Sequence, residues 1–122
     1  MPEQLRKFET QRRRGVIIYL LNLSRPKALE LGSVMYLLDQ RNYPMTRHRL
    51  GEDLDFLRGA GLIRVTTPSS ELMLGDNQQE RCLHSFAESD GECDNDFCVR
   101  LTTKGINFQE GNVEELGVMR VR

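Results

Sequence analysis

The chain has 122 residues, of which 39% are hydrophobic and 29% charged, with a formal net charge of −1 at pH 7. This composition fits one globular domain with a modest core, and no apolar run approaches the roughly 20 residues that a membrane-spanning helix needs. The N-terminus opens with charged residues that no apolar segment follows, so we expect a cytoplasmic protein without a secretory signal. Three cysteines favour a reducing compartment over a disulfide framework.

The charge is distributed unevenly along the chain. Residues 1–67 hold 12 lysines and arginines against seven acids, whereas residues 68–122 hold five against 11. Two parts of a chain with opposite net charge are expected to bind different partners. The basic part is suited to phosphate groups, and the acidic part would be repelled by them.

Two helices are predicted in the first third of the chain, over about residues 4–24 and 28–41. Gly15 weakens the first of them by about 1 kcal/mol relative to alanine, which allows a break there. This helix ends before Pro26, because the residue preceding a proline is pushed out of the helical region. The second helix has apolar residues at core spacing: Leu31, Val34, Leu37 and Leu38.

The third predicted helix, residues 46–59, is the centre of the fold. Thr46 is a good N-cap, since its hydroxyl can accept a hydrogen bond from a first-turn amide. Leucines recur on one face, at Leu50, Leu54 and Leu57. Glycines at 59 and 61 end the helix, and the β-prone residues Leu62, Ile63 and Val65 predict a short strand directly after it.

Three segments carry a family resemblance: SVMYLLDQRNYPMTRHRLGEDLDFLRGAGLIRV (residues 33–65), VRLTTKGINFQEG (residues 99–111) and the closing GV (residues 117–118). Together they resemble small winged-helix (ArsR-like) DNA-binding proteins of Mu-like phages and prophages. The residues at the family's positions are the cap Thr46, the pair Asp53 and Leu54, the aromatic Phe56, and Leu101, Thr102 and Gly105 of its LT-x-x-G. The resemblance implies an α+β winged helix-turn-helix fold with a three-helix core, and binding of double-stranded DNA.

The chain departs from the family in the wing, which is expected to span about residues 62–102 and to be much longer than a hairpin. Residues 68–98 contain one arginine and eight acids. Strands are predicted at Glu71–Leu74 and Arg81–Phe86, and the acid content makes this wing a poor probe of the minor groove. In the C-terminal segment 103–122, a short helix is expected after a cap at Thr102 or Thr103, with Gly111 ending it.

The predicted DNA-binding surface combines phosphate contacts from the first helix with base contacts from the central helix. Arginines and carboxylates can both bind base edges in the major groove, and paired half-sites favour a homodimer. Alternatively, the charged first turn of the central helix is only solvated surface. We expect Asp53 to make a structural bond to a neighbouring helix, and Phe56 to close a dimer or a packed edge. The candidate residues are Arg12, Arg13, Arg14, Thr46, Arg47, His48, Arg49, Glu52 and Arg58.

Cys82, His84, Cys93 and Cys98 are candidate metal ligands, but their spacing lacks the paired cysteines of common zinc sites. Cys82 and His84 would share a face if they lay on a strand; otherwise the cysteines are small buried hydrophobes. We expect no cofactor and no enzymatic activity, since the chain has no Gly-rich phosphate loop, GxSxG or HExxH. The predicted function is a phage-type transcriptional regulator or a DNA-associated accessory factor. The alternatives are a protein-interaction module using the acidic wing, and a metal- or redox-sensing regulator.

Overall fold

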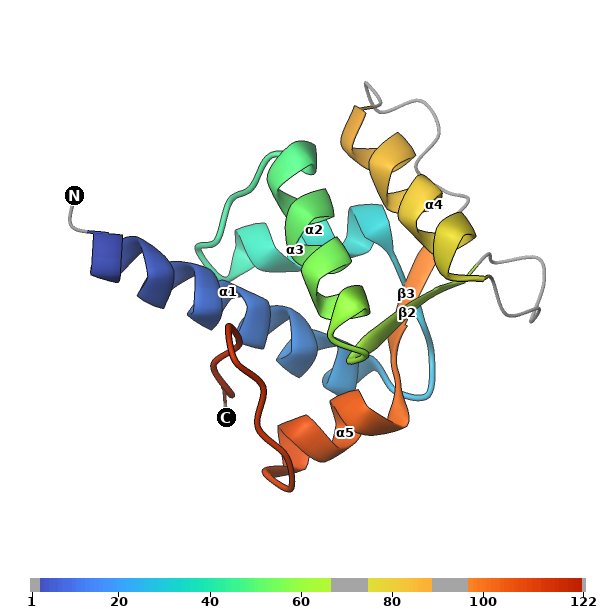
Figure 1. Ribbon diagram of the computed structural model, residues 1–122. Coiled ribbons are helices and arrows are strands. Elements are labelled where there is room, and N and C mark those ends of the chain that lie inside the picture. Colours follow the sequence, from blue (N-terminus) through green and yellow to red (C-terminus); the bar gives the residue numbers. More distant parts are fainter. Residues whose placement is uncertain (1–2, 67–74, 89–96, 122) are drawn as a thin grey trace.

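The structure is a computed structural model that describes residues 3–66, 75–88 and 97–121. Within these ranges it is an α+β arrangement of five helices and a three-stranded antiparallel sheet, compatible with a winged helix. The elements are α1 (Glu3–Ser24), β1 (Leu29–Glu30), α2 (Leu31–Gln40), α3 (Arg47–Gly59), β2 (Ile63–Thr66), α4 (Asp76–Glu88), β3 (Cys98–Leu101) and α5 (Thr103–Glu110). In Figure 1, α1 crosses the molecule between α3 and α5, and α4 lies alongside α3.

The first helix, α1, is continuous through Gly15 and does not break there. Gly15 is buried and serves a close approach instead: a Cβ at this position would overlap the carbonyl oxygen of Met119. The Met119 N–H donates to the carbonyl oxygen of Gln11 at 3.0 Å, so the C-terminal segment crosses α1 at this point. Because Gly15 has no side chain, the C-terminal segment can pack directly on the α1 backbone. This packing compensates for the weak helix propensity of glycine.

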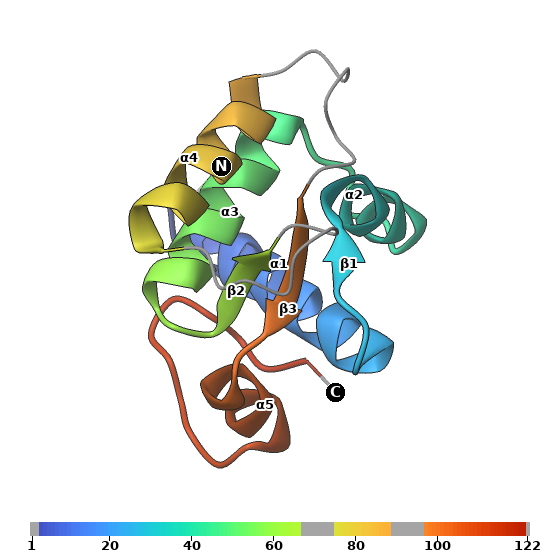
Figure 2. The same ribbon diagram turned by 90° about the vertical axis from the view of Figure 1, so that its right-hand side faces the viewer.

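The sheet has the strand order β1-β3-β2, with every neighbouring pair antiparallel. Leu29 and Glu30 pair with Val99 and Cys98, so α2 begins at Leu31 and not at the predicted position 28. The extended residues 29–30 supply backbone groups to β3, and this pairing overrides the helical pattern of the first predicted turn. Figure 2 shows the short β1 beside β3, with α5 below the sheet.

The central helix α3 agrees with its prediction. The Thr46 side chain accepts a hydrogen bond from the Arg49 N–H at 3.1 Å, as expected of an N-cap. Leu50, Leu54 and Leu57 are fully buried. The chain then turns through Gly61, whose φ of 81° suits glycine, and enters β2.

The predicted wing is wrong in one respect: residues 76–88 form the helix α4, and Arg81–Phe86 is not a strand. Gln79, Leu83 and Phe86 are buried, and their spacing of four and three residues is that of a helix face. Gln79 Oε1 accepts the Val65 N–H at 2.9 Å, which satisfies a backbone donor on the outer edge of β2. The other predicted wing strand, Glu71–Leu74, lies outside the described residues.

The core lies between α1, the inner face of the sheet, and the inner faces of the other helices. Thr102 caps α5 by accepting from the Gly105 N–H at 3.1 Å, and Gly111 ends this helix with a φ of 87°, as expected. The buried core residues contributed by all these elements include Ile17, Ile18, Leu21, Leu31, Val34, Leu38, Leu50, Leu54, Leu57, Leu62, Val65, Leu83, Phe86, Val99 and Phe108.

Candidate nucleic-acid interface

Arg13 and Arg14, two arginines of the cluster predicted to contact phosphates, bind a buried carboxylate. Arg13 donates to Asp53 Oδ2 at 2.5 Å and to Asp53 Oδ1 at 3.1 Å, and Arg14 donates to Oδ1 at 3.1 Å. Asp53 is only 2% exposed, and the arginine side chains are 12% and 18% exposed. Arg13 and Arg14 neutralise a buried carboxylate, and their predicted contacts with DNA phosphates would compete with these ion pairs.

The same bonds confirm the expectation that Asp53 makes a structural contact with a neighbouring helix. They tie α3 to α1, and Arg14 extends the connection to the C-terminal segment by donating to the Gly117 carbonyl oxygen at 3.4 Å. The Arg14 guanidinium also lies 3.8 Å from the centre of the Phe56 ring. A Cβ at Gly117 would lie 2.7 Å from this ring, so Phe56 belongs to a packed edge of the domain.

Arg12 is the member of the cluster that remains exposed, and its Nε donates to the Tyr43 hydroxyl at 2.9 Å. On α3, by contrast, two of the predicted base-contacting arginines have partners within the protein. Arg47 donates to the Phe86 carbonyl oxygen at 3.0 Å and lies over the Phe86 ring at 4.1 Å. Arg58 donates to Asp55 Oδ1 at 2.9 Å. The expected DNA contacts of Arg47 and Arg58 therefore compete with these internal bonds.

The remaining solvent-facing residues at the start of α3 are His48, Arg49 and Glu52. His48 Nε2 lies 2.9 Å from Glu52 Oε1, and these side chains are 67% and 63% exposed. Thr46, also predicted to contact DNA, uses its hydroxyl as an acceptor within its own helix. The open part of α3 is thus narrow, and it contains the carboxylate of Glu52 as well as the guanidinium of Arg49.

The flank of α3 beside this open part is covered by α4. Gly51 is buried there, and a Cβ on it would lie 2.9 Å from the Ala87 Cβ. A cavity of about 780 Å³, the α3–α4 groove, runs between the two helices. Its ionisable lining consists of Glu52, Asp55, Glu80, Glu88, Arg81 and the two histidines His48 and His84. Carboxylates outnumber guanidinium groups even when Arg58, which pairs with Asp55, is included, so the groove would repel phosphate.

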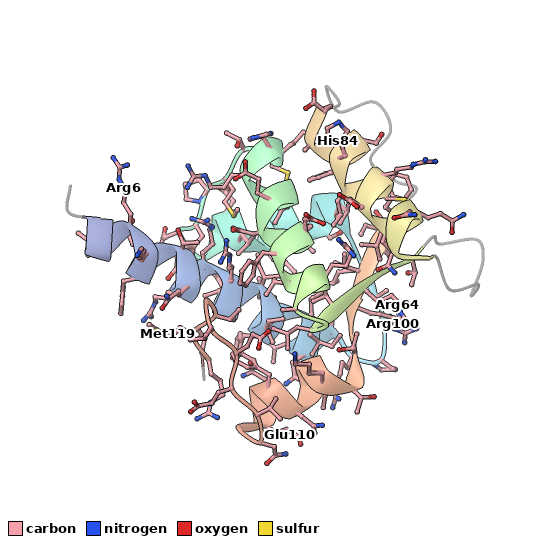
Figure 3. The ribbon with its side chains drawn as sticks, in the orientation of Figure 1. Arg6, Arg64, His84, Arg100, Glu110 and Met119 are labelled. Atoms are coloured by element: carbon pink, nitrogen blue, oxygen red, sulfur yellow. The ribbon has the colours of Figure 1, made fainter. Side chains whose placement is uncertain are left out.

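A second charged surface lies on the outer face of the sheet, and no sequence pattern predicted it. Arg64 of β2 and Arg100 of β3 are directly opposed in the antiparallel register, so their side chains leave the sheet on the same side. Figure 3 shows them beside each other, away from the helices that cover the inner face. Like charges in this position destabilise a sheet. Within the described part of the chain, neither arginine forms an ion pair.

Arg25 and Lys27, in the turn between α1 and β1, extend this positive surface. Both are exposed, and with Arg100 they line a cavity of about 360 Å³. An Arg100 Nη2–H donates to the Pro26 carbonyl oxygen at 3.2 Å, which fixes the turn against β3. We call Arg25, Lys27, Arg64 and Arg100 the basic face. Glu30 is the acid among the described strand residues; it lies opposite Cys98, on the same face of the sheet as Arg64 and Arg100 and diagonal to Arg100.

The candidate metal ligands do not come together among the described residues. Cys82 and His84 lie on α4, where a separation of two residues points side chains to different faces, whereas the prediction assumed a strand. Cys93 lies outside the described ranges, and Cys98 is on β3. No group of three or more His, Cys, Asp and Glu side chains in those ranges is arranged to hold a metal ion. Burial raises the pKa of the Cys82 thiol, and burial together with the Glu30 carboxylate raises the pKa of Cys98.

Comparison of the chain with protein-family models, with curated proteins and with solved structures found no match. None of the helices in the described ranges combines the length and apolar character needed to cross a membrane.

Proposed function

We propose that this chain is a winged-helix protein that binds duplex DNA, and that the basic face makes its main phosphate contacts. The order of the elements supports the fold: a helix, a short strand, two helices and two four-residue strands with α4 between them and α5 after them, in a sheet of order β1-β3-β2. This order and the segments that resemble small winged-helix DNA-binding proteins of Mu-like phages support the same class of function. The proposed biological role is a phage-type regulator or DNA-associated accessory factor.

The observation on which the location rests is the opposed pair Arg64 and Arg100. Two guanidinium groups side by side repel each other in the unbound protein, and an anion between them removes that repulsion. Guanidinium groups donate fork-shaped pairs of hydrogen bonds that suit phosphate oxygens. Arg25 and Lys27 add two exposed cations on the α1–β1 turn.

The central helix has a smaller role in this proposal than the sequence predicted. Its acidic flank against α4 disfavours deep entry into a groove lined by phosphates. Arg49, together with Arg12 on α1, remains available for contacts near the start of α3. Binding through phosphates alone depends little on sequence, so we expect modest discrimination between DNA sequences.

The test compares two matched charge reversals in a fluorescence-anisotropy assay with a random-sequence duplex of about 25 base pairs. Arg64→Glu/Arg100→Glu removes the opposed pair, and Arg12→Glu/Arg49→Glu removes the exposed arginines near the start of α3. We expect the first variant to lose binding by more than about 30-fold at low salt, and the second by less than about fivefold. Circular dichroism and thermal unfolding establish that both variants remain folded.

Three outcomes would contradict the proposal in different ways. If the unmodified protein fails to bind duplex DNA at low salt, the proposed function is wrong. If Arg12→Glu/Arg49→Glu alone abolishes binding, the DNA contact lies at α3 and not on the sheet. Equal losses in both variants would contradict a dominant role of the basic face.

A further inference from the structure

The cavity of about 360 Å³ beside Arg100 is lined by both cationic and aliphatic side chains. It lies where the end of α1, the α1–β1 turn, the end of β3 and α5 meet, a region seen below the sheet in Figure 2. Three cations line it: Arg25, Lys27 and Arg100. Three aliphatic side chains line it as well: Leu21, Leu101 and Ile106.

Burial separates these two sets of side chains within the cavity. The cations are exposed and so form its rim, whereas Leu21 and Leu101 are 1% and 8% exposed and Ile106 is half-buried. The apolar set therefore forms the floor. A cavity with a few polar groups around an apolar floor is the usual form of a small-molecule site, and its volume lies within the range of such sites.

The rim is prepared for an anion. Arg100 uses one N–H on the Pro26 carbonyl oxygen, which holds the guanidinium in place and leaves further donors, because a guanidinium has five N–H groups. Neither Arg25 nor Lys27 forms an ion pair with a carboxylate in the described part of the chain. Three cations around one opening match a phosphate monoester, whose charge at pH 7 is about −1.5 to −2.

We propose that this cavity binds a nucleotide, with its terminal phosphate on the cationic rim and its base against the aliphatic floor. Two sources offer the same chemistry: a free mononucleotide, and the 5′-phosphorylated end of a DNA strand. The strand-end form rests on the DNA-binding function proposed above, whereas the free-nucleotide form does not. Inorganic phosphate would satisfy the rim without making contacts to the aliphatic floor, so we expect it to bind more weakly than the nucleotide.

Two measurements test the proposal and separate its two sources. Anisotropy compares two duplexes of identical sequence, one with 5′-phosphate ends and the other with 5′-hydroxyl ends. Amide chemical shifts of the ¹⁵N-labelled protein are followed during titrations with deoxyadenosine monophosphate and with inorganic phosphate. We expect about tenfold tighter binding of the phosphorylated duplex, from charge-assisted hydrogen bonds to its terminal phosphate. We also expect deoxyadenosine monophosphate to shift the amides of Lys27, Arg100 and Ile106.

Matched variants separate this site from the rest of the basic face. Lys27→Gln should remove the preference for the 5′-phosphate, whereas Arg64→Gln, outside the cavity, should weaken both duplexes equally and preserve their ratio. Equal binding of both duplexes, without nucleotide-induced shifts at the cavity, would overturn the inference even if Arg64-dependent DNA binding persists. Equal affinity for inorganic phosphate and deoxyadenosine monophosphate would overturn the role of the floor. Nucleotide binding without duplex binding would retain the cavity and refute the DNA-binding function.

Discussion

Asp53 shows at the residue scale how one buried charge holds two helices and the chain's C-terminal segment together. Its carboxylate accepts hydrogen bonds from Arg13 and Arg14, and Arg14 in turn contacts Phe56 and the Gly117 carbonyl oxygen. Removing one partner of a buried ion pair costs more than the pair contributes, because the remaining charge stays buried without compensation.

We predict that Asp53→Asn lowers the free energy of unfolding by about 3 kcal/mol, since two partly buried guanidinium groups lose their counter-charge. Urea unfolding followed by circular dichroism measures this loss. The control is Glu52→Gln at the adjacent exposed position, where we expect a change within about 0.5 kcal/mol. A loss of equal size at both positions would show that the burial of Asp53 is unimportant.

The pKa of Cys98 provides a pH-dependent prediction at the same scale. Burial and the Glu30 carboxylate both raise this pKa, so the reactive thiolate is scarcer at pH 8 than in an ordinary cysteine. Glu30→Gln removes the second cause and should increase the rate of Cys98 alkylation by iodoacetamide at pH 8. Cys82, whose pKa is raised by burial alone, is the internal control when peptides are quantified by mass spectrometry. Equal acceleration at both cysteines would indicate general loosening of the fold.

At the scale of elements, the sequence predicted those features that depend on local pattern. The Thr46 cap, the buried leucines of α3 and the helix after Thr102 follow from rules that act within a few residues. The strand predicted at Arg81–Phe86 is wrong, because a short segment of this kind fits both alternation and helical spacing. The burial of Leu83 and Phe86 against α3 favours the helix over the strand. This is a tertiary contact, which the local sequence pattern does not contain.

The basic face and the small cavity could not be predicted, for a related reason. Arg64 and Arg100 lie far apart in the sequence, and only the register of β2 against β3 makes them neighbours. The cavity likewise combines the end of α1, the α1–β1 turn and the end of β3. The arginine cluster at 12–14 was visible in the sequence, but the carboxylate that neutralises two of its members lies on another helix.

The packing of α4 against α3 yields a prediction for a single glycine. Gly51→Leu inserts a side chain where even a Cβ would lie 2.9 Å from the Ala87 Cβ, so we expect α4 to be displaced and stability to fall by about 1–3 kcal/mol. Hydrogen exchange of residues 76–88 should accelerate. Gly59→Leu on the same helix is the matched control, because a Cβ there has no neighbour within 4 Å. Unchanged exchange in Gly51→Leu would refute the close contact.

At the scale of the whole molecule, charge is separated between two surfaces: the basic face on the sheet and the acidic α3–α4 groove. The net charge of −1 does not reveal this separation. Salt screens charges beyond about 10 Å, so a ligand responds to the charges of the nearby surface and not to the sum over the molecule. If the protein binds DNA as proposed, a duplex on the side of the sheet would meet these cations first. We would then expect one orientation of the protein on the duplex to be favoured.

Salt dependence measures how many cations act together. If the four residues of the basic face neutralise four phosphates, log K plotted against log salt concentration has a slope of about −3.6. Arg64→Gln/Arg100→Gln should reduce the magnitude of this slope to about 1.8, because two contacts are removed. Anisotropy titrations between 50 and 300 mM salt, roughly the range over which such binding is lost, provide the slopes. An unchanged slope in the variant would exclude these arginines as phosphate contacts.

The crossing of the C-terminal segment over Gly15 has a consequence for the order of events during folding. The bond from Arg14 to Gly117 joins residues 103 positions apart, so it closes nearly the whole chain into one loop. Loops of that length close late, after local helices and hairpins have formed. During synthesis, α1 leaves the ribosome before the C-terminal residues around Met119 have been made. The surface of α1 at Gly15 is therefore uncovered until those residues pack on it. We therefore expect docking of this segment to be a late step in folding.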